Sequence, residues 1–328
     1  MLIAVDAVGG DHYPERPVQG AVKAANESDN IEILLVGPEE LIEKELNKLD
    51  YKSNKINILH APEIIGMEDS AASAVKQKKN SSITKGIAAH KQGDCAAFVS
   101  AGNTGALLAA SMFLLGKLEG VIRPTIAATY PTIQGVSLLV DAGANLELKP
   151  EMYLQFAKMS RIFASEIMNI EEPTVGLLNV GEEPEKGTDL HKEVHKMLSD
   201  MPGFRGNIEG KDILFGKTDI YLTDGFSGNV LLKFGESIPE ILYHMLTKTM
   251  EEKGSDAQTQ QTVLGMISDT MQAFNYEHVG GIPFLGVNGM SLVGHGGSSV
   301  EAIKNMILNA SKCVENHVNH KIVEVLNN

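Results

Sequence analysis

Short apolar runs that alternate with amphipathic helical segments constrain the fold of this 328-residue chain more than any other feature. The runs LIAVDA, IEILLVG and KINILHA are separated by helical patterns, the second of which carries Pro38 in its first turn. A longer helical stretch with a possible break near Asn80 follows, and further apolar runs lie at residues 95–100, 125–131, 135–143, 173–181 and 219–225. Apolar strands that alternate with helices imply a mostly parallel sheet covered on both faces. We therefore expect a three-layer α/β/α fold in a single domain, residues 1–328.

Loops rich in glycine, Asp, Asn, Ser and Thr follow the predicted strands. They read DAVGGDHYP from Asp6, SAGNTG from Ser100, DAGANLELKP from Asp141, VGEEPEKGTD from Val180, DGFSGN from Asp224 and GHGGSS from Gly294. In open α/β sheets, ligands bind at the carboxyl ends of the strands. Six such loops at one edge of a sheet therefore indicate a binding site, although each loop alone is more readily explained as an ordinary connection.

The stretch VSAGNTGAL, residues 99–107, places small and polar residues between two apolar segments. A helix that starts at Ala106 would expose backbone N–H groups at its first turn, which favours an anion such as phosphate. We predict that Ser100, Asn103, Thr104 and the backbone from Gly102 to Ala106 form an anion cradle. The alternative is a plain helix cap by Thr104 or Ser100.

Composition limits the classes of function. The formal net charge of −14 argues against a nucleic-acid partner in general, although a local basic patch remains open. Two cysteines, Cys95 and Cys313, are too few for a disulfide scaffold or a thiolate metal site, and they fit a reducing cytosol. The longest uncharged run, residues 95–116, has Asn103-Thr104-Gly105 at its centre, which argues for a buried strand-turn-helix and against a membrane span. No signal peptide is visible, and we expect a cytoplasmic protein.

Familiar catalytic motifs are missing from the sequence. It has no G-x-G-x-x-G after a strand, no H-E-x-x-H and no G-x-S-x-G, and residues 210–218 imitate a Walker A loop with a spacer one residue too long. His191 and His195 share a helix face among charged residues, which is typical of solvated surface. Cys95 reads as a core residue.

Residues 238–274 differ from the rest because they read as two helices with no strand beside them. Gly254-Ser255-Asp256 lies between the two patterns, and apolar residues of the first follow helical spacing. We predict a protruding helical hairpin inserted within the domain. Its apolar face is either an ordinary core or dimer face, or a tip near residues 263–267 that touches lipid weakly.

The loops taken together resemble a known family. The motifs AVDAVGGDHYP, SAGNTGALLA, RPTIA, DAGAN, LLNVGEEPEKG, DGFSGNVLLK and a run like LLGVNGMSLVGHG are similar, in order and spacing, to the acyl-acyl carrier protein:phosphate acyltransferases of bacterial phospholipid synthesis, the PlsX family. The match runs from Val5 to His295 and beyond. Val8 stands where the family motif has Met, and PFLGVNG where it has LLGVNG. Neither departure removes a polar group.

The resemblance implies transfer of a fatty acyl group from acyl carrier protein to inorganic phosphate, without metal or organic cofactor. The acyl phosphate product would serve a membrane acyltransferase that acylates glycerol 3-phosphate. It also implies a fold similar to phosphate acetyltransferases and isocitrate-dehydrogenase-like proteins, a homodimer, and peripheral association with the membrane. Because phosphate is itself the nucleophile, the site needs only positioning, fixed hydrogen-bond donors and a cation or two.

We predict catalytic roles for Lys186, as the cation, and for Asn229, as an amide donor to a carbonyl oxygen; Asp224 is either catalytic or, like Ser227, a helix cap. The predicted substrate-binding residues, which lie in the loops or in the matching motifs, are Asp6, Gly10, Asp11, His12, Ser100, Gly102, Asn103, Thr104, Gly105, Arg123, Asp141, Asn145, Gly225, Ser227 and His295.

Three other functions stay open from the sequence. A phosphate acetyltransferase-like enzyme would use acyl-coenzyme A in place of the carrier protein. A non-catalytic regulator could keep the fold, although Lys186, Asn103 and Asn229 form a polar set that simple binding does not require. An NAD-dependent dehydrogenase is disfavoured because the glycine fingerprint is missing.

Overall fold

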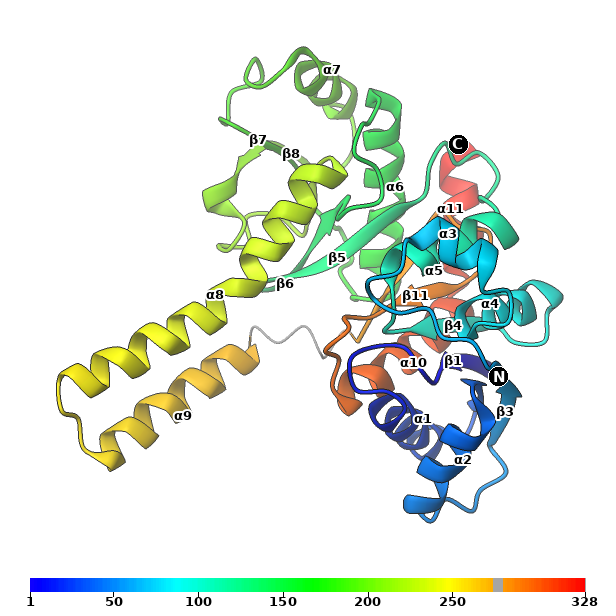
Figure 1. Cartoon of the computed structure of the whole chain (residues 1–328). Helices are drawn as coiled ribbons and strands as arrows, with labels where there is room; N and C mark the ends of the chain where they lie inside the picture. Colours follow the sequence, from blue (N-terminus) through cyan, green and yellow to red (C-terminus); the bar gives the residue numbers. More distant parts are fainter. Residues whose placement is uncertain (274–279, 328) are drawn as a thin grey trace. The chain divides into compact units, whose positions relative to one another are not determined.

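The computed structural model describes residues 1–273 and 280–327 of the chain (Figure 1). These residues form two compact units. Unit 1 contains Met1–Ala127, Lys158–Glu171 and the C-terminal residues 280–327, and unit 2 contains Ala128–Ala157 and residues 172–273. Strand β5 (Thr125–Thr132) and helix α6 (Pro150–Glu166) run from one unit into the other. That the two units form a single domain stays a prediction.

Unit 1 contains a mostly parallel sheet. Its strand order is β3 (Ile56–His60), β2 (Glu32–Gly37), β1 (Leu2–Asp6), β4 (Ala97–Ser100), β11 (Ser291–Val293), β10 (Ile282–Leu285) and β5. The strands from β3 to β11 are parallel to one another, whereas β10 is antiparallel to both β11 and β5. The carboxyl ends of β1, β4 and β11 therefore lie side by side at one edge of this sheet.

Helices cover both faces of the sheet of unit 1. On one side, α1 (Glu15–Glu27) packs against α2 (Glu39–Lys48) and α10 (Val300–Glu315), and α10 is followed by α11 (Val318–Asn327). On the other side, α3 (Ala71–Gln77) and α4 (Ser82–Gln92) pack against α5 (Thr104–Leu114). The layers on the two faces confirm the expected mostly parallel α/β architecture.

The core of unit 1 shows why the apolar runs become buried strands. Ile3 and Val5 on β1 and Phe98 on β4 are at most 1 % exposed. Helix α4 approaches β4 so closely that a Cβ on Gly86 would stand 2.0 Å from the Phe98 ring. A side chain at position 86 would have to displace that ring, so the glycine sets the distance between helix and sheet.

Unit 2 contains the remaining strands. Their order is β6 (Gly135–Val140), β9 (Ile220–Leu222), β7 (Val175–Asn179) and β8 (Phe204–Glu209), all parallel, with β5 as the neighbour of β6. Helix α7 (Asp189–Leu198) packs on β7 and β8, and a 3₁₀ turn (Gly210–Asp212) follows β8. A small core forms around Tyr221 and Leu139, against which Leu231 and Leu232 of the next helix pack.

The predicted hairpin is present, but its first helix begins earlier than expected. Helix α8 spans Gly225–Glu252 and runs through Pro239, and α9 (Ala257–Ala273) packs against it (Figure 1). The sequence pattern predicted the hairpin for residues 238–274. Instead, Asp224 caps the helix at Gly225. The turn between the arms lies at residues 253–256, so residues 263–267 lie along the second arm and not at its tip; Phe274 lies outside the described residues.

Most of the other predicted elements are confirmed, including the break near Asn80, which falls between α3 and α4. The long uncharged run, residues 95–116, folds as β4, a turn and α5, as expected. Strands β8, β10 and β11 were not predicted. In the described part of the chain, we find no helix with the length and apolarity that crossing a membrane requires.

A partly buried histidine, His90, joins α4 to the strand region of unit 1. The Nδ1 of His90 lies 2.9 Å from the carbonyl of Cys95, and its Nε2 accepts a hydrogen bond from the Met290 N–H at 2.9 Å. Because Nε2 must be unprotonated to accept, the ring is neutral. Burial lowers the pKa of His90 below its usual value of 6.5, opposed by the bond to Cys95.

We predict that His90 makes stability depend on pH. As the pH falls below about 6.5, the unfolded chain takes up a proton at this position before the folded protein does, so the free energy of unfolding decreases by up to about 1.4 kcal/mol per pH unit. His90→Gln removes this contribution. Urea unfolding of both proteins at about pH 7.5 and about pH 5.5 should show the wild type losing more stability on acidification. Parallel losses would exclude the mechanism.

Candidate functional site

Three glycine-containing loops meet at the carboxyl ends of β1, β4 and β11 in unit 1; we call them the first cluster. They comprise residues 7–14, 101–103 and 294–299. The backbones touch directly: Asp11 N–H donates to the Gly296 carbonyl at 2.8 Å, and Gly294 N–H donates to the Ser100 carbonyl at 2.9 Å. The helices α1, α5 and α10 begin after these loops, and the first turn of any helix has N–H groups without an intrahelical acceptor.

Close approach of backbones explains the glycines in this cluster. A Cβ on Gly9 would stand 2.7 Å from an Asp6 carboxylate oxygen and 2.9 Å from the Gly102 nitrogen. A Cβ on Gly10 would stand 2.8 Å from the Gly296 carbonyl oxygen. Side chains at these two positions would therefore push the three loops apart.

Asp6 and Ser100 form the internal framework of the cluster. Both are almost fully buried, and the Ser100 hydroxyl donates to Asp6 Oδ2 at 2.6 Å while accepting from the Gly102 N–H at 3.0 Å. Asp6 Oδ1 also accepts from the Val8 N–H at 3.1 Å. Burial raises the pKa of Asp6, opposed by its hydrogen bonds to Ser100, Ser82 and Val8. These two residues hold loops in place rather than present groups to a ligand.

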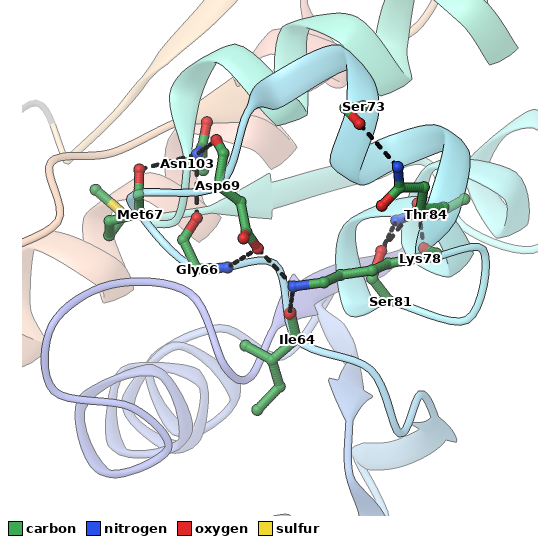
Figure 2. Close-up of polar contacts among 10 residues, drawn as sticks. Ile64, Gly66, Met67, Asp69, Ser73, Lys78, Ser81, Thr84 and Asn103 are labelled. Atoms are coloured by element: carbon green, nitrogen blue, oxygen red, sulfur yellow. Dashed lines mark hydrogen bonds and ion pairs between the residues drawn. The ribbon is translucent and has the colours of Figure 1, made fainter.

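Asn103 is likewise used inside the protein. Its Oδ1 accepts from the Ala106 N–H at 2.9 Å and so caps α5. The alternative prediction, a helix cap in this stretch, is therefore confirmed, but the capping residue is Asn103 and not Thr104 or Ser100. Its Nδ2 donates to the carbonyls of Gly66, Met67 and Asp69, each at 3.1 Å (Figure 2). The side chain is only 8 % exposed. Thr104 and Gly105 are more open, so the backbone of this turn remains the candidate anion contact.

The remaining predicted residues of unit 1 differ in position. Asp11, His12 and His295 are exposed at the first cluster, where His295 Nδ1 accepts from the Gly297 N–H at 3.1 Å. Arg123 is exposed just before β5, whose direction places the residue at the opposite edge of the sheet. The structure does not bring Arg123 together with the first cluster, so a role in binding stays a prediction without support from its position.

Sequence reasoning missed Arg16. Its Nη1 donates to the carbonyls of Gly297 at 2.9 Å and Ser298 at 3.3 Å, which fixes the third loop to the start of α1. The residue adds a positive charge to a cluster that contains Asp6 and Asp11. The only sequence signal was its closeness to the first glycine-rich loop.

A second cluster lies in unit 2 at the carboxyl ends of β6 and β9. Asp141 is fully buried, and its Oδ1 accepts from the N–H groups of Gly143 at 3.0 Å and Ala144 at 2.8 Å. Its Oδ2 accepts from Asn145 Nδ2 at 2.6 Å, and the Asn145 carbonyl accepts from the Gly225 N–H at 2.7 Å. Burial raises the pKa of Asp141, whereas these hydrogen bonds oppose the rise. The Asp141 carboxylate therefore fixes the conformation of the loop that follows it.

The start of α8 packs against this loop. Asp224 Oδ1 accepts from the Ser227 N–H at 2.8 Å and Oδ2 from the Ser227 hydroxyl at 2.9 Å, which confirms that Asp224 caps the helix. Asn229 is exposed and close to Gly143, whose Cβ would stand 3.5 Å from Asn229 Oδ1. Among the described residues, the Asn229 side chain has no hydrogen-bond partner, so its amide is available to a ligand.

Lys186 lies in the loop between β7 and α7. Its backbone is fixed because Asn179 Nδ2 donates to the Lys186 carbonyl at 3.1 Å, whereas its ammonium is 4.0 Å from Glu183, at the limit of an ion pair. The side chain is 49 % exposed. A fixed backbone with a loosely paired ammonium suits a contact with an anionic ligand.

His191 and His195 were predicted to be solvated surface residues, but both are partly buried. His191 Nδ1 lies 2.7 Å from the Thr188 hydroxyl; burial lowers the pKa of His191, and the negative charge of Asp224 opposes this effect. His191 therefore lies near the second cluster, two residues beyond the loop VGEEPEKGTD that predicted the site. His195 packs edge-on against Phe204, with ring centroids 5.4 Å apart.

Neither thiol nor acidic residues add an obvious reactive group. Burial raises the pKa of Cys95 to about 11 and that of Cys313 to about 12, so both are poor nucleophiles. Among the described residues, Glu182, Glu209 and Asp212 form the one acidic group close enough to hold a metal ion. Lys217 already lies 2.6 Å from Glu182 and 3.4 Å from Asp212, which neutralises part of that charge.

The chain is similar in sequence to a defined family. Residues 1–321 match the model of a family described as "Fatty acid synthesis protein". A phosphate acyltransferase of Salinibacter ruber is 45 % identical over 98 % of this chain and 96 % of its own length. A phosphate acyltransferase of Chlorobaculum tepidum is 46 % identical over 97 % of this chain and 100 % of its own length.

The fold is similar to that of solved phosphotransacetylases. A phosphotransacetylase from Streptococcus pyogenes matches 96 % of this chain and 94 % of its own, with a TM-score of 0.62 at 15 % identity. The EutD phosphotransacetylase from Staphylococcus aureus matches 95 % of this chain and 94 % of its own, with a TM-score of 0.59 at 15 % identity. These matches confirm the expected fold.

We predict that the first turn of α8 tolerates no side chain at position 228. A Cβ there would stand 1.9 Å from the Asp141 carbonyl oxygen, so Gly228→Ala should lower the free energy of unfolding by at least about 1–3 kcal/mol. Gly265→Ala is the matched control, because a Cβ at this helical position meets nothing within 4 Å. It should stabilise the protein by about 0.5–1 kcal/mol. Equal effects in urea unfolding would refute the contact.

Proposed function

The chain belongs to the family of fatty acid synthesis proteins, and from that premise we propose that it is a phosphate acyltransferase that uses a fatty acyl group carried by acyl carrier protein. In this reaction a phosphate oxygen attacks the thioester carbonyl carbon. The new C–O bond forms, the C–S bond breaks, and the carrier thiolate leaves and takes up a proton from solvent. The products are an acyl phosphate and the free carrier thiol.

The first cluster is the observation that carries this proposal. Its three backbones meet before three helix N-termini, where N–H groups and the helix dipole favour an anion. The reaction asks for a bound phosphate and no protein nucleophile, and the buried, high-pKa thiols fit that requirement. We assign phosphate binding to the backbone around Gly102–Gly105, with Gly10, His12 and His295 at the rim.

Within unit 2 by itself, the second cluster offers two groups that suit an acyl-transfer step. Lys186 offers an ammonium with only a distant partner, and Asn229 offers an amide without a partner among the described residues. A cation and a fixed donor stabilise the negative charge that develops on the carbonyl oxygen in the transition state. Asp141, Asn145, Gly225 and Ser227 hold the surrounding loop and helix start.

One assay tests the proposal against its closest alternative. The purified protein is incubated with phosphate and either a palmitoyl carrier protein or palmitoyl-coenzyme A, and both free thiol and acyl phosphate are measured. We expect both products to form faster with the carrier protein. Preference for coenzyme A would favour a phosphotransacetylase-like activity, and thiol release without acyl phosphate would contradict the function.

We predict that Lys186→Ala and Asn229→Ala each lower kcat/KM by about 100- to 1000-fold, because a charge or donor contact in the transition state contributes about 2.7–4 kcal/mol. Lys192→Ala is the control for Lys186, since Lys192 is similarly exposed and paired with Asp189 at 3.0 Å. Asp224→Asn is the control for Asn229, because asparagine also caps helices. Both controls should stay near wild-type rates. A larger loss in Asp224→Asn than in Asn229→Ala would reverse the assignment.

The hairpin supports a further proposal, a homodimer. Large apolar side chains on α8 are 52–65 % exposed at four-residue or seven-residue spacing, which places them on one helix face; they are Phe226, Val230, Phe234, Ile241 and Met245. An exposed apolar stripe of this length marks an interaction surface. We assign it to a second copy of the chain.

We also propose weak, reversible contact of the hairpin with membrane, in a cytoplasmic enzyme that supplies a membrane glycerol-3-phosphate acyltransferase. The net charge of −14 gives no attraction to anionic lipid, so binding must depend on apolar area. Within residues 263–267, Met266 is 64 % exposed, whereas Val263, Leu264 and Ile267 are partly buried. Met266 is therefore the residue to test.

We predict that Met266→Asp loses co-sedimentation with liposomes but keeps the dimer and soluble acyl phosphate formation. Ile241→Asp combined with Met245→Asp should yield monomers, measured by light scattering after gel filtration. If Met266→Asp also yields monomers, this arm belongs to the dimer interface and the membrane assignment has to be withdrawn.

A further inference from the structure

The segment Gly66–Asp69 borders the first cluster, and it is fastened at both ends (Figure 2). It has no helix or strand and leads from the isolated bridge at Glu63 to α3. Asp69 Oδ2 accepts from the Gly66 N–H at 2.8 Å and pairs with Lys78 Nζ at 2.5 Å. Lys78 also donates to the Ile64 carbonyl at 2.8 Å. A loop with this many internal bonds keeps one shape in the folded protein.

Asn103 ties this segment to the start of α5. Both N–H groups of its amide are shared among the carbonyls of Gly66, Met67 and Asp69, and its Oδ1 is used by the Ala106 N–H. No donor of the side chain is left for phosphate. The Asn103 amide therefore fixes both the first turn of α5 and the segment Gly66–Asp69.

Met67 is the residue that the segment presents to the cluster. It is 47 % exposed, so its thioether is open to a ligand. The atoms nearest to a Cβ built on Gly296 are the Met67 terminal methyl, at 3.1 Å, and the two Asp11 carboxylate oxygens, at 3.2 and 3.4 Å. A flexible thioether thus lies directly beside the polar loops, within unit 1.

We propose that Met67 contacts the alkyl chain of the acyl donor next to its carbonyl, and that Asn103 is a positioning residue that holds Met67 there. The inference rests on the proposed function, since that reaction joins an apolar chain to a phosphate. Methionine adapts its shape to flexible apolar groups. The bonded segment holds the thioether at the border of the polar loops, one of which also carries the exposed Tyr13.

Kinetics with two acyl donors tests the role of Met67. Met67→Gln keeps the length of the side chain but makes it polar. It should raise the KM for a palmitoyl carrier protein about five- to tenfold, corresponding to the loss of one or two buried methylene contacts. The KM for phosphate should stay within about twofold of the wild type, and the effect should be smaller with a butyryl carrier protein. Met67→Leu should restore the wild-type values.

Asn103→Ser tests the positioning role, because serine still caps a helix and stays neutral but cannot reach the three carbonyls. It should raise the KM for the palmitoyl donor as Met67→Gln does, and the double variant should show little further change, because both substitutions remove one contact. A rise in the KM for phosphate alone would make Asn103 a phosphate ligand and overturn the proposal. If Asn103→Ser does not fold, the Met67 series decides.

The outcomes separate this inference from the function itself. If the wild type forms acyl phosphate but Met67→Gln affects palmitoyl and butyryl donors equally or not at all, the inference is wrong and the function stands. If the wild type forms none, the function fails. Binding of palmitoyl carrier protein without phosphate, measured by calorimetry, then decides whether Met67 contacts the chain: the variant must bind about five- to tenfold more weakly than the wild type.

Discussion

The parallel alignment of β1, β4 and β11 is the constraint on which the first cluster depends. Because parallel strands end at one edge of a sheet, three loops that are distant in the sequence are forced into contact there. The contact is made by main chain: the Asp11 N–H bonds to the Gly296 carbonyl, and a side chain on Gly9 or Gly10 would separate the loops. The hydrogen bond between the buried Ser100 and Asp6 then fixes the distance between the first and second loops. The helix starts follow from the same alignment, since each loop leads into a helix.

Polar residues in such loops divide into two kinds that a sequence does not distinguish. Asp6, Ser100, Asn103, Asp141 and Asp224 all have carboxylate, hydroxyl or amide groups used within the protein, as caps or as loop anchors. Lys186 and Asn229 keep their functional groups mostly free. The framework set is the larger one because every loop backbone at a sheet edge needs partners for its own N–H and carbonyl groups.

The fold could be predicted to a large extent because its strands are apolar runs and its helices are amphipathic. Strands β10 and β11 could not, since three or four residues between glycines give no period to recognise, yet β11 carries the third loop of the first cluster. The first helix of the hairpin was predicted to begin at residue 238, whereas α8 begins at Gly225 and runs through Pro239. Arg16 and His191 were missed because their roles come from contacts made across the fold. The sequence predicted that glycine-rich loops gather at the carboxyl ends of the strands, and in unit 1 three of them do so. It could not show which of their polar groups bond within the protein.

A site assembled from main-chain groups has an evolutionary consequence. Substitutions can remove a side-chain ligand in one step, but no substitution removes a peptide N–H except one to proline. The anion site that we propose in the first cluster is therefore vulnerable mainly at the glycines that let the backbones meet. Apolar positions such as Met67, by contrast, can change without disturbing that site. With the roles proposed above, a lineage of such enzymes can adjust which donor it accepts while its acceptor stays the same.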